Sequence, residues 1–563
     1  MRSDKSLLRW FHTDTPWVWL NAGAVALCLL TLLGILMLIS VQGLAHFWPK
    51  QLLQAQVTTA EQSHRIIGEV IRHEQVSVQR LRNAGPGLET DAVELRRTLI
   101  RGANRELSES DFFWVLDATL SEQAHPDTLA VFERTRWGKL YGYLRELSED
   151  GQVLLREDGQ SNAPQLWNAF EQRLQRAHSL QGEIDHIEGD LLGHINRQLE
   201  ALRLEQRRLE LLGPLQQPQR TTLEQQRVEL EQEYQLLRKR LTRLQQQLRR
   251  DSFKVEVADG RELEFAMADV IRAYRPNQMQ LLDKLKHYGS KLWEFLSDSP
   301  REGNTEGGVF PALFGTVLMV LLMSLLVTPF GVLAAVYLHE YAYQGRLTRI
   351  IRIAVNNLAG VPSIVYGIFG LGFFVYFVGG NIDALFFPET LPAPTFGTGG
   401  LLWASATLAL LTLPVVIVAT EEGLRTIPNS LREGALALGA TRAETLWKIV
   451  LPMASPAMMT GVILAIARAA GEVAPLMLVG VVKLVPQLPV DGYFPYLHLD
   501  QKFMHLGFHI YDVGFHSANT EAAQPLVYAT ALLLLLVILL LNLSAILMRN
   551  HLRARFRTLE PEL

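Results

Sequence analysis

Apolar and polar stretches alternate along this chain of 563 residues, and one polar stretch is far longer than the others. A transmembrane helix needs about 20 consecutive, mostly apolar residues. Six stretches are long enough: Val18–Leu44, Phe310–Leu338, Ile350–Val378, Leu401–Thr420, Met453–Gly480 and Pro525–Met548. The pattern predicts a mainly α-helical, polytopic membrane protein with six transmembrane helices. The segment 45–309 separates the first of them from the other five.

The first apolar stretch, Val18–Leu44, follows the basic residues Arg2, Lys5 and Arg9 and could be read as a secretory signal. Its apolar core is longer than the roughly 7–15 residues of a signal peptide, and we find no convincing small-residue cleavage site after it. We therefore expect an uncleaved membrane anchor.

Basic residues are distributed unevenly over the short loops. One set of loops and ends carries Arg346, Arg349, Arg425, Arg432, Arg442, Lys448, Arg549, Arg553, Arg555 and Arg557. The connection 379–400 carries no Lys or Arg, and 481–524 carries only two lysines. Because Lys and Arg in short loops mark the cytoplasmic side, we expect both termini, 1–17 and 549–563, in the cytoplasm. The long segment 45–309 would then lie in the periplasm.

The composition excludes several classes of protein. The single cysteine, Cys28, excludes a disulfide framework outside the cytoplasm. No G-x4-G-K-[ST] phosphate loop is present, and the nearest match, Gly289-Ser290-Lys291, lacks the upstream glycine. We therefore expect no catalytic residue and no ATP site or other cofactor site in this chain. Its net charge of −4 gives no indication of a nucleic-acid partner.

The middle of the long segment has a helical pattern. Apolar residues at helical spacing run from Trp167 to Leu212, and Gly213-Pro214 and Pro218 then break the pattern. Beyond the break, Leu223, Leu230, Leu237 and Leu244 are seven residues apart, and from Leu230 onward Tyr234, Leu241 and Leu248 turn this repeat into an alternation of four and three. Such a heptad seam, with Gln, Glu and Arg on the other faces, predicts an antiparallel coiled-coil hairpin over about 164–250.

Short alternating patterns flank this hairpin. Two strands are predicted at Phe253–Val257 and Leu263–Phe265, because the turn Asp259-Gly260 between alternating runs is a strong β-hairpin signal. Further strands are expected at Asp111–Leu116 and Gln152–Leu155. The hairpin therefore interrupts small α/β elements on either side of it.

Two further features of the segment 45–309 follow from its turn residues. Asp158-Gly159 predicts a turn, and the segment 302–308 (EGNTEGG) predicts a flexible linker into the second transmembrane helix. The role of the whole segment stays open between docking of a soluble partner and a passive insertion.

The polar loop Glu421–Pro452 carries a spaced pattern, E-x-A-x3-G-x9-I-x-L-P. Its members are Glu433, Ala435, Gly439, Ile449, Leu451 and Pro452. The spacing predicts two short amphipathic helices with a glycine turn between them, and Pro452 is expected to begin the next transmembrane helix. The pattern resembles the EAA loop of ABC-importer permeases, which binds a cytoplasmic ATPase. The alternative is an ordinary loop between membrane helices.

Two opposite charges, Arg468 and Glu472, lie near the middle of the fifth apolar stretch. A charge at that depth is costly unless it is paired or faces water. Four residues apart on one helix, the two can pair with each other. In the functional interpretation, Arg468 offers its guanidinium to a passing oxyanion and Glu472 holds it in place. The alternative is a structural ion pair.

Several segments together resemble one family. They are TPFGVLAAVYLHEYA (Thr328–Ala342), AGVPSIVYGIFG (Ala359–Gly370), the loop Glu421–Pro452 and IARAAGEVAPLMLVG (Ile466–Gly480). They are similar to the PstA-type permeases of bacterial phosphate ABC importers. The resemblance covers the expected permease core, 310–548, and not the long segment 45–309, which shorter members of the family lack.

The resemblance implies a type I ABC-importer permease core and a multi-pass subunit of the bacterial inner membrane. It implies three partners: a homologous second permease, a cytoplasmic ATPase dimer that binds ATP, and a periplasmic phosphate-binding protein. In that family a membrane Arg and a nearby Glu are associated with the phosphate path, and Arg468 and Glu472 are the matching positions.

Two alternatives remain open at this stage. The substrate could be another oxyanion, such as sulfate or molybdate, or the chain could be a membrane-anchored sensor or scaffold whose coiled coil is the working part. We expect no metal site, because the histidines of the last polar loop fit no usual ligand spacing. They are His498, His505, His509 and His516, and their surroundings suit an interfacial loop.

Overall fold

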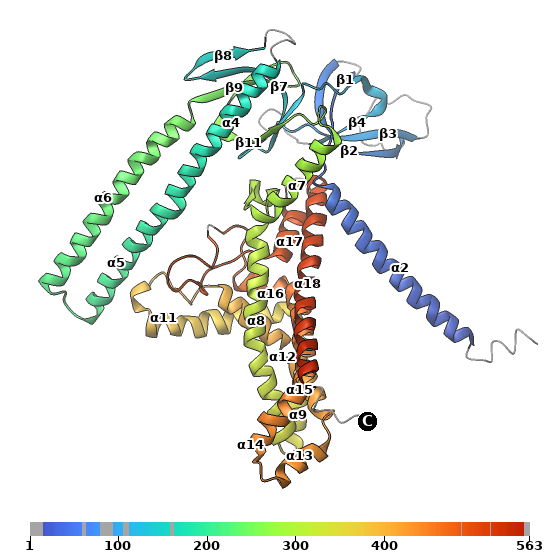
Figure 1. Cartoon of the computed structure of the whole chain (residues 1–563), viewed down its shortest axis with the longest axis vertical. Helices are drawn as coiled ribbons and strands as arrows, with labels where there is room; N and C mark the ends of the chain where they lie inside the picture. Colours follow the sequence, from blue (N-terminus) through green and yellow to red (C-terminus); the bar gives the residue numbers. More distant parts are fainter. Residues whose placement is uncertain are drawn as a thin grey trace, which may run out of the picture. The chain divides into compact units, whose positions relative to one another are not determined.

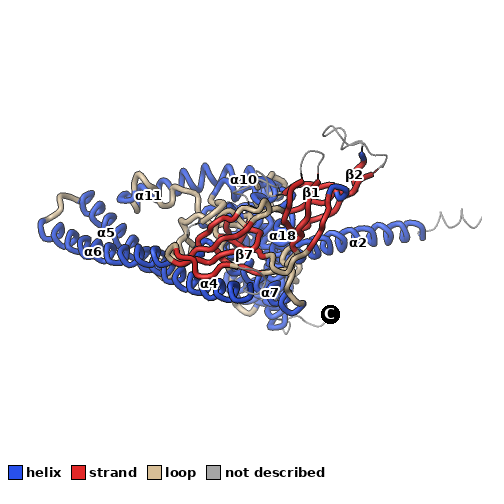
Figure 2. Tube along the Cα trace, turned by 90° about the horizontal axis from the view of Figure 1, so that it is seen from above, coloured by secondary structure: helices blue, strands red, loops and turns tan. Residues whose placement is uncertain are grey.

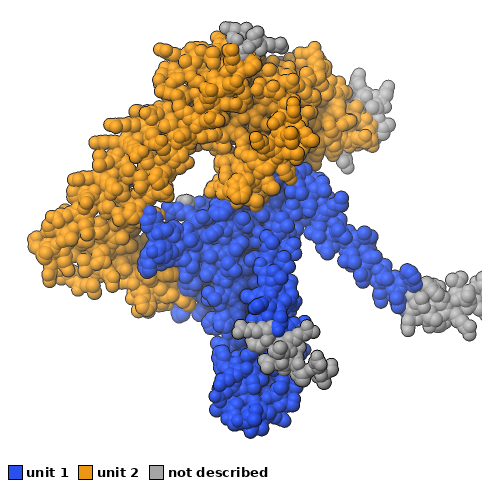
Figure 3. Space-filling view, viewed as in Figure 1, with its two compact units in different colours: residues 1–47, 309–377, 398–563 blue, residues 48–308, 378–397 orange. Residues whose placement is uncertain are grey.

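The computed structural model describes residues 15–58, 63–78, 94–104, 112–157, 163–485, 487–517 and 520–556. The chain forms two compact units (Figure 3). The first, here called the membrane unit, comprises Met1–Phe47, Val309–Phe377 and Thr398–Leu563. The second, here called the insertion unit, comprises Trp48–Gly308 and Val378–Gly397.

The prediction of six membrane helices is confirmed for the described residues. Six helical stretches are long and apolar enough to cross a bilayer: Trp17–Ala45, Phe310–Tyr341, Ser363–Phe386, Leu401–Arg425, Arg442–Gly471 and Ala523–Ala554. They contain the helices α2 (Thr15–Ala45), α8 (Phe310–Val336), α10 (Ser363–Phe369), α12 (Leu401–Arg425), α15 (Leu451–Gly471) and α18 (Thr520–Phe556), labelled in part in Figure 1.

Helix α12 lies at the centre of the membrane unit, where it packs against both α8 and α15. Glycines allow these close contacts: a β-carbon on Gly331 would lie 2.6 Å from a Val416 methyl group, and one on Gly461 would lie 2.8 Å from the β-carbon of Ala419. Small residues at such contacts let membrane helices approach closely, which increases van der Waals contact between them.

The third span is present at Ser363–Phe386, but its predicted bounds, Ile350–Val378, are wrong. A separate helix, α9 (Arg346–Leu358), comes first, and α10 begins only at Ser363. The chain breaks between them because Gly360 is a weak helix former and Pro362 restricts the residue before it to extended backbone. The apolar helix then continues through a π segment (Gly370–Gly379) and α11 (Gly380–Phe386).

The insertion unit is richer in strands than the sequence indicated. One antiparallel sheet has the order β4-β3-β2-β1-β5, and a second has the order β10-β9-β7-β6-β11 with β8 paired to β7. The strands are β1 (Leu52–Thr58), β2 (Ser63–Ser77), β3 (Glu94–Arg101), β4 (Phe112–Leu116), β5 (Leu120–Ala124), β6 (Ala130–Arg134), β7 (Lys139–Glu149), β8 (Gln152–Arg156), β9 (Asp251–Glu256), β10 (Glu262–Ala266) and β11 (Val270–Tyr274).

A long helical hairpin extends from the second sheet. One arm consists of α4 (Ala163–Asp185), a π segment (His186–Leu192) and α5 (Gly193–Leu212), and the other is α6 (Gln217–Leu248). The arms lie side by side in Figures 1 and 2. Aromatic packing holds the base of the hairpin to the second sheet. The ring centroid of Phe170 in α4 lies 5.6 Å from that of Phe132 in β6 and 5.1 Å from that of Phe253 in β9.

Several predictions for the insertion can be checked individually. The strands β9 and β10 pair around the turn at Asp259-Gly260 as predicted, and β4 and β8 occupy the expected positions. The prediction of a flexible linker over 302–308 is wrong, because Pro300–Arg301 (β12) pairs with Glu306–Gly307 (β13) in a small hairpin. Its sequence is rich in Gly, but Arg101 holds it in place through an ion pair with Glu306. The turn predicted at Asp158-Gly159 lies outside the described residues.

The last polar loop contains a short helix, α17 (Leu506–His516), that the apolar pattern did not indicate. His505 and His509 are buried at this helix rather than exposed at an interface. The Nδ1 atom of His505 accepts a hydrogen bond from the Gly507 backbone N–H, which caps the first turn.

Candidate functional site

The loop after α12 folds as two helices joined by a tight glycine turn. Helix α13 (Asn429–Ala437) ends in a Schellman motif, in which the Ala440 N–H donates to the Ala435 carbonyl and the Gly439 N–H to the Leu436 carbonyl. Gly439 has φ +88°, a backbone conformation that L side chains rarely adopt. The predicted glycine turn is therefore confirmed, and Gly439 is required by its backbone angle.

The second helix of the loop begins at a capping box. Thr441 accepts a hydrogen bond from the Glu444 N–H, and the Glu444 carboxylate accepts one from the Thr441 N–H. Pro452 does not begin a new helix, contrary to the prediction. Helix α14 (Arg442–Thr445) continues through a π turn (Leu446–Val450) into α15. The wider turn fits here because Pro452 has no N–H to donate within an α-helix.

Most residues of the predicted pattern maintain the shape of the loop. Ala435 is buried, and Ile449, Leu451 and Pro452 are half-buried. Leu451 packs against a buried cluster formed by Val336, Leu424, Ile427, Leu446, Val450 and Ala454. Glu433 is exposed. The pattern therefore marks residues that fold the loop more than residues that face outward.

Sequence reasoning missed the outward face of this loop. Leu436, Leu438 and Trp447 have 44%, 91% and 66% of their surface exposed. These three apolar side chains and the exposed acid Glu433 are here called the loop surface. The available signal was a large apolar residue directly after each buried one, at Leu436 after Ala435 and at Trp447 after Leu446. Consecutive helical residues lie about 100° apart, so a helix that buries the first of them turns the second away from the buried side.

An arginine that the sequence analysis used only for orientation fixes the loop to two other elements. The Arg432 guanidinium donates to the Leu424 carbonyl at 2.9 Å and to the Ile427 carbonyl at 2.8 Å, where α12 ends. It also pairs at 2.9 Å with Glu340, which follows α8. A second pair, Arg352 with Glu421 at 3.4 Å, connects α9 to α12.

Arg468 and Glu472 lie at the end of α15 rather than in the middle of a span. The helix ends at Gly471, and Glu472 has extended backbone with ψ 130°. A separate short helix, α16 (Ala474–Val479), follows. The predicted continuous span Met453–Gly480 is therefore wrong. Pro475 favours the break, since it has no N–H to continue the hydrogen bonding of α15, and its fixed φ suits the first turn of the new helix α16.

The structure nevertheless brings the two charges together. The Arg468 Nε atom lies 3.6 Å from a Glu472 carboxylate oxygen, and the two side chains are 34% and 22% exposed. That distance makes an ion pair that is longer than a hydrogen bond. Among the described residues, no hydrogen bond engages the two terminal nitrogens of Arg468. The guanidinium is thus oriented by one partner and keeps donors available for an anion.

The chain around this pair is closely packed. Helix α16 lies against α10, where a β-carbon on Gly367 would come within 2.7 Å of the Pro475 α-carbon. Gly367 is therefore the residue that lets α10 approach the break after Glu472. Both ends of the break are fixed, which restricts the positions that Arg468 can sample.

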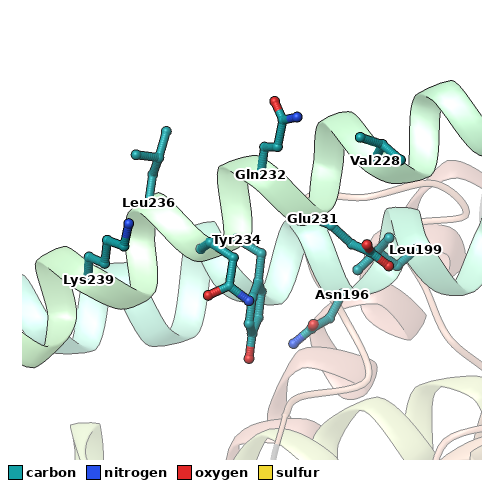
Figure 4. Close-up of a pocket in the computed structure, with 9 residues that line it drawn as sticks. Asn196, Leu199, Val228, Glu231, Gln232, Tyr234, Leu236 and Lys239 are labelled. Carbon is teal, nitrogen blue, oxygen red and sulfur yellow. The ribbon is translucent and has the colours of Figure 1, made fainter.

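A groove of about 750 Å³ lies elsewhere, on the helical hairpin (Figure 4). It is lined by residues of α5 and α6, among them Asn196, Leu199, Glu231 and Tyr234. None of the predicted site residues lines it. Its open, mixed lining does not resemble a buried ligand site.

The C-terminal part of the chain matches a known transporter family. Residues 327–558 match the family described as binding-protein-dependent transport system inner membrane component. The match contains the loop and the Arg468–Glu472 pair, and it excludes Trp48–Gly308. The chain is therefore a multi-pass membrane subunit of this class of transporter.

Similar proteins of known name indicate which branch of this transporter family the chain belongs to. The phosphate transport system permease protein PstA 1 of Mycobacterium tuberculosis is 34% identical over 244 residues, which span 43% of this chain and 71% of that protein. The PstA protein of Pasteurella multocida is 31% identical over 252 residues, 45% of this chain and 79% of that protein. The chain belongs to the PstA family of phosphate transport system permeases.

A more distant likeness is found among solved structures. A chain of the MetNI methionine ABC transporter, in an inward-facing conformation, aligns with 43% of this chain and 94% of its own, at 18% identity and a TM-score of 0.32. That likeness is too distant to define any geometry of this chain.

Proposed function

We propose that this chain carries inorganic phosphate across the inner membrane, as one of two permease subunits in an ATP-driven importer. Family membership supports the transport of phosphate, and the Arg468–Glu472 pair is the observation that connects the structure to an anion. A planar guanidinium presents parallel N–H donors that match the oxygens of a tetrahedral oxyanion.

In this proposal Glu472 has two effects. It orients the guanidinium from one side, and its negative charge keeps the anion from binding too tightly to leave. An importer needs such weak binding, because a substrate that binds strongly inside the pathway is not released. Sulfate and molybdate would meet the same guanidinium, so discrimination among oxyanions has to come from other groups or from a separate binding protein.

The loop surface, Glu433 with Leu436, Leu438 and Trp447, is proposed to bind a cytoplasmic ATPase dimer that binds and hydrolyses ATP. An exposed apolar patch rimmed by charge is typical of a protein interface. The remaining pattern residues, Ala435, Gly439, Ile449, Leu451 and Pro452, would hold that surface in shape. Movement of the ATPase would then pass through α13 and α15 to the break after Arg468.

Orientation and partners are part of the proposal. Basic residues in the short loops support a cytoplasmic position for both termini, 1–17 and 549–563, and for the loop. The segment 45–309 would then lie in the periplasm, where a phosphate-binding protein delivers substrate. A homologous second permease would complete the pathway. The helical hairpin, about 164–250, would act as a coiled coil within that segment.

The pair Arg432–Glu340 gives a first prediction. Arg432→Gln is expected to lower phosphate uptake about tenfold while ATP hydrolysis continues, because a charged hydrogen bond worth about 1.5–3 kcal/mol no longer holds α13 to the end of α8. Uptake and ATPase activity are measured on the same reconstituted complex. The double variant Arg432→Gln/Glu340→Gln should be no worse than the single one.

Lys448→Gln is the control for the loss of charge, since Lys448 is exposed and pairs only loosely with Glu444 at 3.6 Å. It should retain normal coupling. If Arg432→Gln behaves like this control, the ion pair does not transmit movement.

The substrate is tested by reconstituting the chain in proteoliposomes with its second permease, ATPase and binding protein. We expect ATP-dependent uptake of radiolabelled phosphate that excess unlabelled phosphate abolishes and excess sulfate or molybdate does not. If the complex takes up sulfate or molybdate in preference to phosphate, that oxyanion is the substrate and the assignment of phosphate is wrong. If the assembled complex hydrolyses ATP but transports no oxyanion, the result contradicts the transport proposal and favours a sensor or scaffold.

A further inference from the structure

One helix of the insertion unit has its amphipathic faces reversed. Helix α7 (Leu281–Ser297) is the last α-helix before the membrane helix α8. A helix on the surface of a soluble domain buries its apolar face and exposes its polar face. In α7 a charged cluster is directed toward the protein together with the buried Phe295, and most of the large apolar side chains are directed outward.

The inward face of α7 is held by a charged network. Lys291 pairs with Glu133 of β6 at 2.5 Å and with Glu294 at 3.0 Å. Glu294 also pairs with Arg272 of β11 at 3.1 Å. Burial alone would raise the pKa of Glu294, but Lys291, Arg272 and Arg301 outweigh it and lower the pKa to about 2. The carboxylates of this face are therefore ionised, and their ion pairs fix the helix to the sheet.

The outward face of α7 is apolar along its whole length. Leu281, Leu282, Leu285 and Trp293 have 67%, 78%, 50% and 71% of their surface exposed. Their spacing places them on one side of the helix, together with Gly289 and the half-buried Leu292 and Leu296. The exposed Lys286 borders this side. Exposing so many large apolar groups to water is unfavourable, so this face requires an apolar partner.

Both membrane attachments of the insertion unit come close to α7. The ring centroid of Trp48 lies 6.1 Å from that of Tyr288, in the middle of α7. Trp48 comes three residues after the end of the membrane helix α2. The Gly308 N–H donates to the Ser299 carbonyl just beyond α7, and α8 begins two residues later, at Phe310. Three residues of chain span at most about 11 Å.

We propose that the apolar face of α7 lies in the lipid headgroup region at the membrane surface where α2 ends and α8 begins. Leucines and a tryptophan on one face with lysine at its edge are the side chains that interfacial helices use. Lys286 would contact lipid phosphate groups. The helix thereby fixes the insertion unit against the bilayer at a third point, between its two covalent attachments.

A soluble protein partner is the competing occupant of this face. The lipid surface is favoured because chain connectivity alone keeps α7 close to two bilayer crossings. A partner protein would have to compete with lipid at that depth. An outward apolar face on α7 also suits a bilayer, because lipid accepts apolar side chains without any specific pattern of charges on the helix.

Because Cys28 is the chain's single cysteine, replacing it lets one new cysteine at a time be labelled in the test. In the Cys28→Ser background, Leu285→Cys and Ser290→Cys are labelled separately with a polarity-sensitive fluorophore in the full complex in lipid nanodiscs. The two positions lie about 140° apart on the helix. Spin-labelled lipids are expected to quench the probe at residue 285 at least about twofold more than the probe at 290. Aqueous iodide should show the reverse order.

Two results would overturn the proposal. One is equal quenching by lipid at the two positions, or none at residue 285. The other is a probe at 285 that lipid does not quench and that becomes shielded from iodide only when the soluble binding protein is added. This second result would assign the face to that protein.

Discussion

Phosphate uptake is expected to fall at least about tenfold when Arg468 is replaced by alanine. The guanidinium is the group near the end of α15 that is charged, half-exposed and oriented by a single carboxylate 3.6 Å away. A charge-assisted hydrogen bond contributes about 1.5–3 kcal/mol, which corresponds to roughly a 10- to 100-fold change in rate or affinity. Uptake of radiolabelled phosphate by proteoliposomes, at equal amounts of assembled complex, measures the loss.

Two variants separate anion binding from simple packing. Arg468→Lys keeps the charge but loses the planar fork, so it should recover only part of the uptake. Glu472→Gln should weaken the orientation of Arg468 and alter the apparent affinity for phosphate more than the assembly of the complex. Arg425→Ala, at an exposed position, is the control for loss of a cation. Wild-type uptake by Arg468→Ala would remove this residue from the transport path.

The second large effect is expected at Gly439. Its φ of +88° costs an L-residue roughly 1–2 kcal/mol and more for a β-branched side chain. Space is not the constraint, because a β-carbon there would meet nothing within 4 Å. Gly439→Val should therefore reorganise the turn between α13 and α14 and separate ATP hydrolysis from phosphate uptake, measured together on one reconstituted complex.

A graded series makes this prediction specific to backbone conformation. Gly439→Asn should retain more coupling than Gly439→Ala although Asn is larger, because Asn tolerates positive φ better. Gly434→Ala is the matched control on the preceding helix, since Gly434 also has open space around it but has helical backbone. It should be neutral or slightly stabilising. A loss of coupling that follows side-chain size instead would contradict the role of the turn.

Much of the loop could be predicted from the sequence because its geometry is local. Gly439 and the capping box at Thr441 and Glu444 each satisfy hydrogen bonds within a few residues of chain. The end of α15 could have been predicted from Pro475, but the apolar run past it hid the break. Arg432–Glu340 could not be predicted, since the two residues are 92 positions apart and neither belongs to the spaced pattern.

The order of residues alone is enough to show which segments are apolar enough to cross a membrane and where a glycine turn must occur. Both depend on transfer free energies and backbone angles that belong to the local chain. The folded chain was needed to show where the spans break, how the two sheets of the insertion unit are ordered, and which face of α7 points outward. These depend on pairings between distant residues, such as Lys291 with Glu133, that no local pattern encodes.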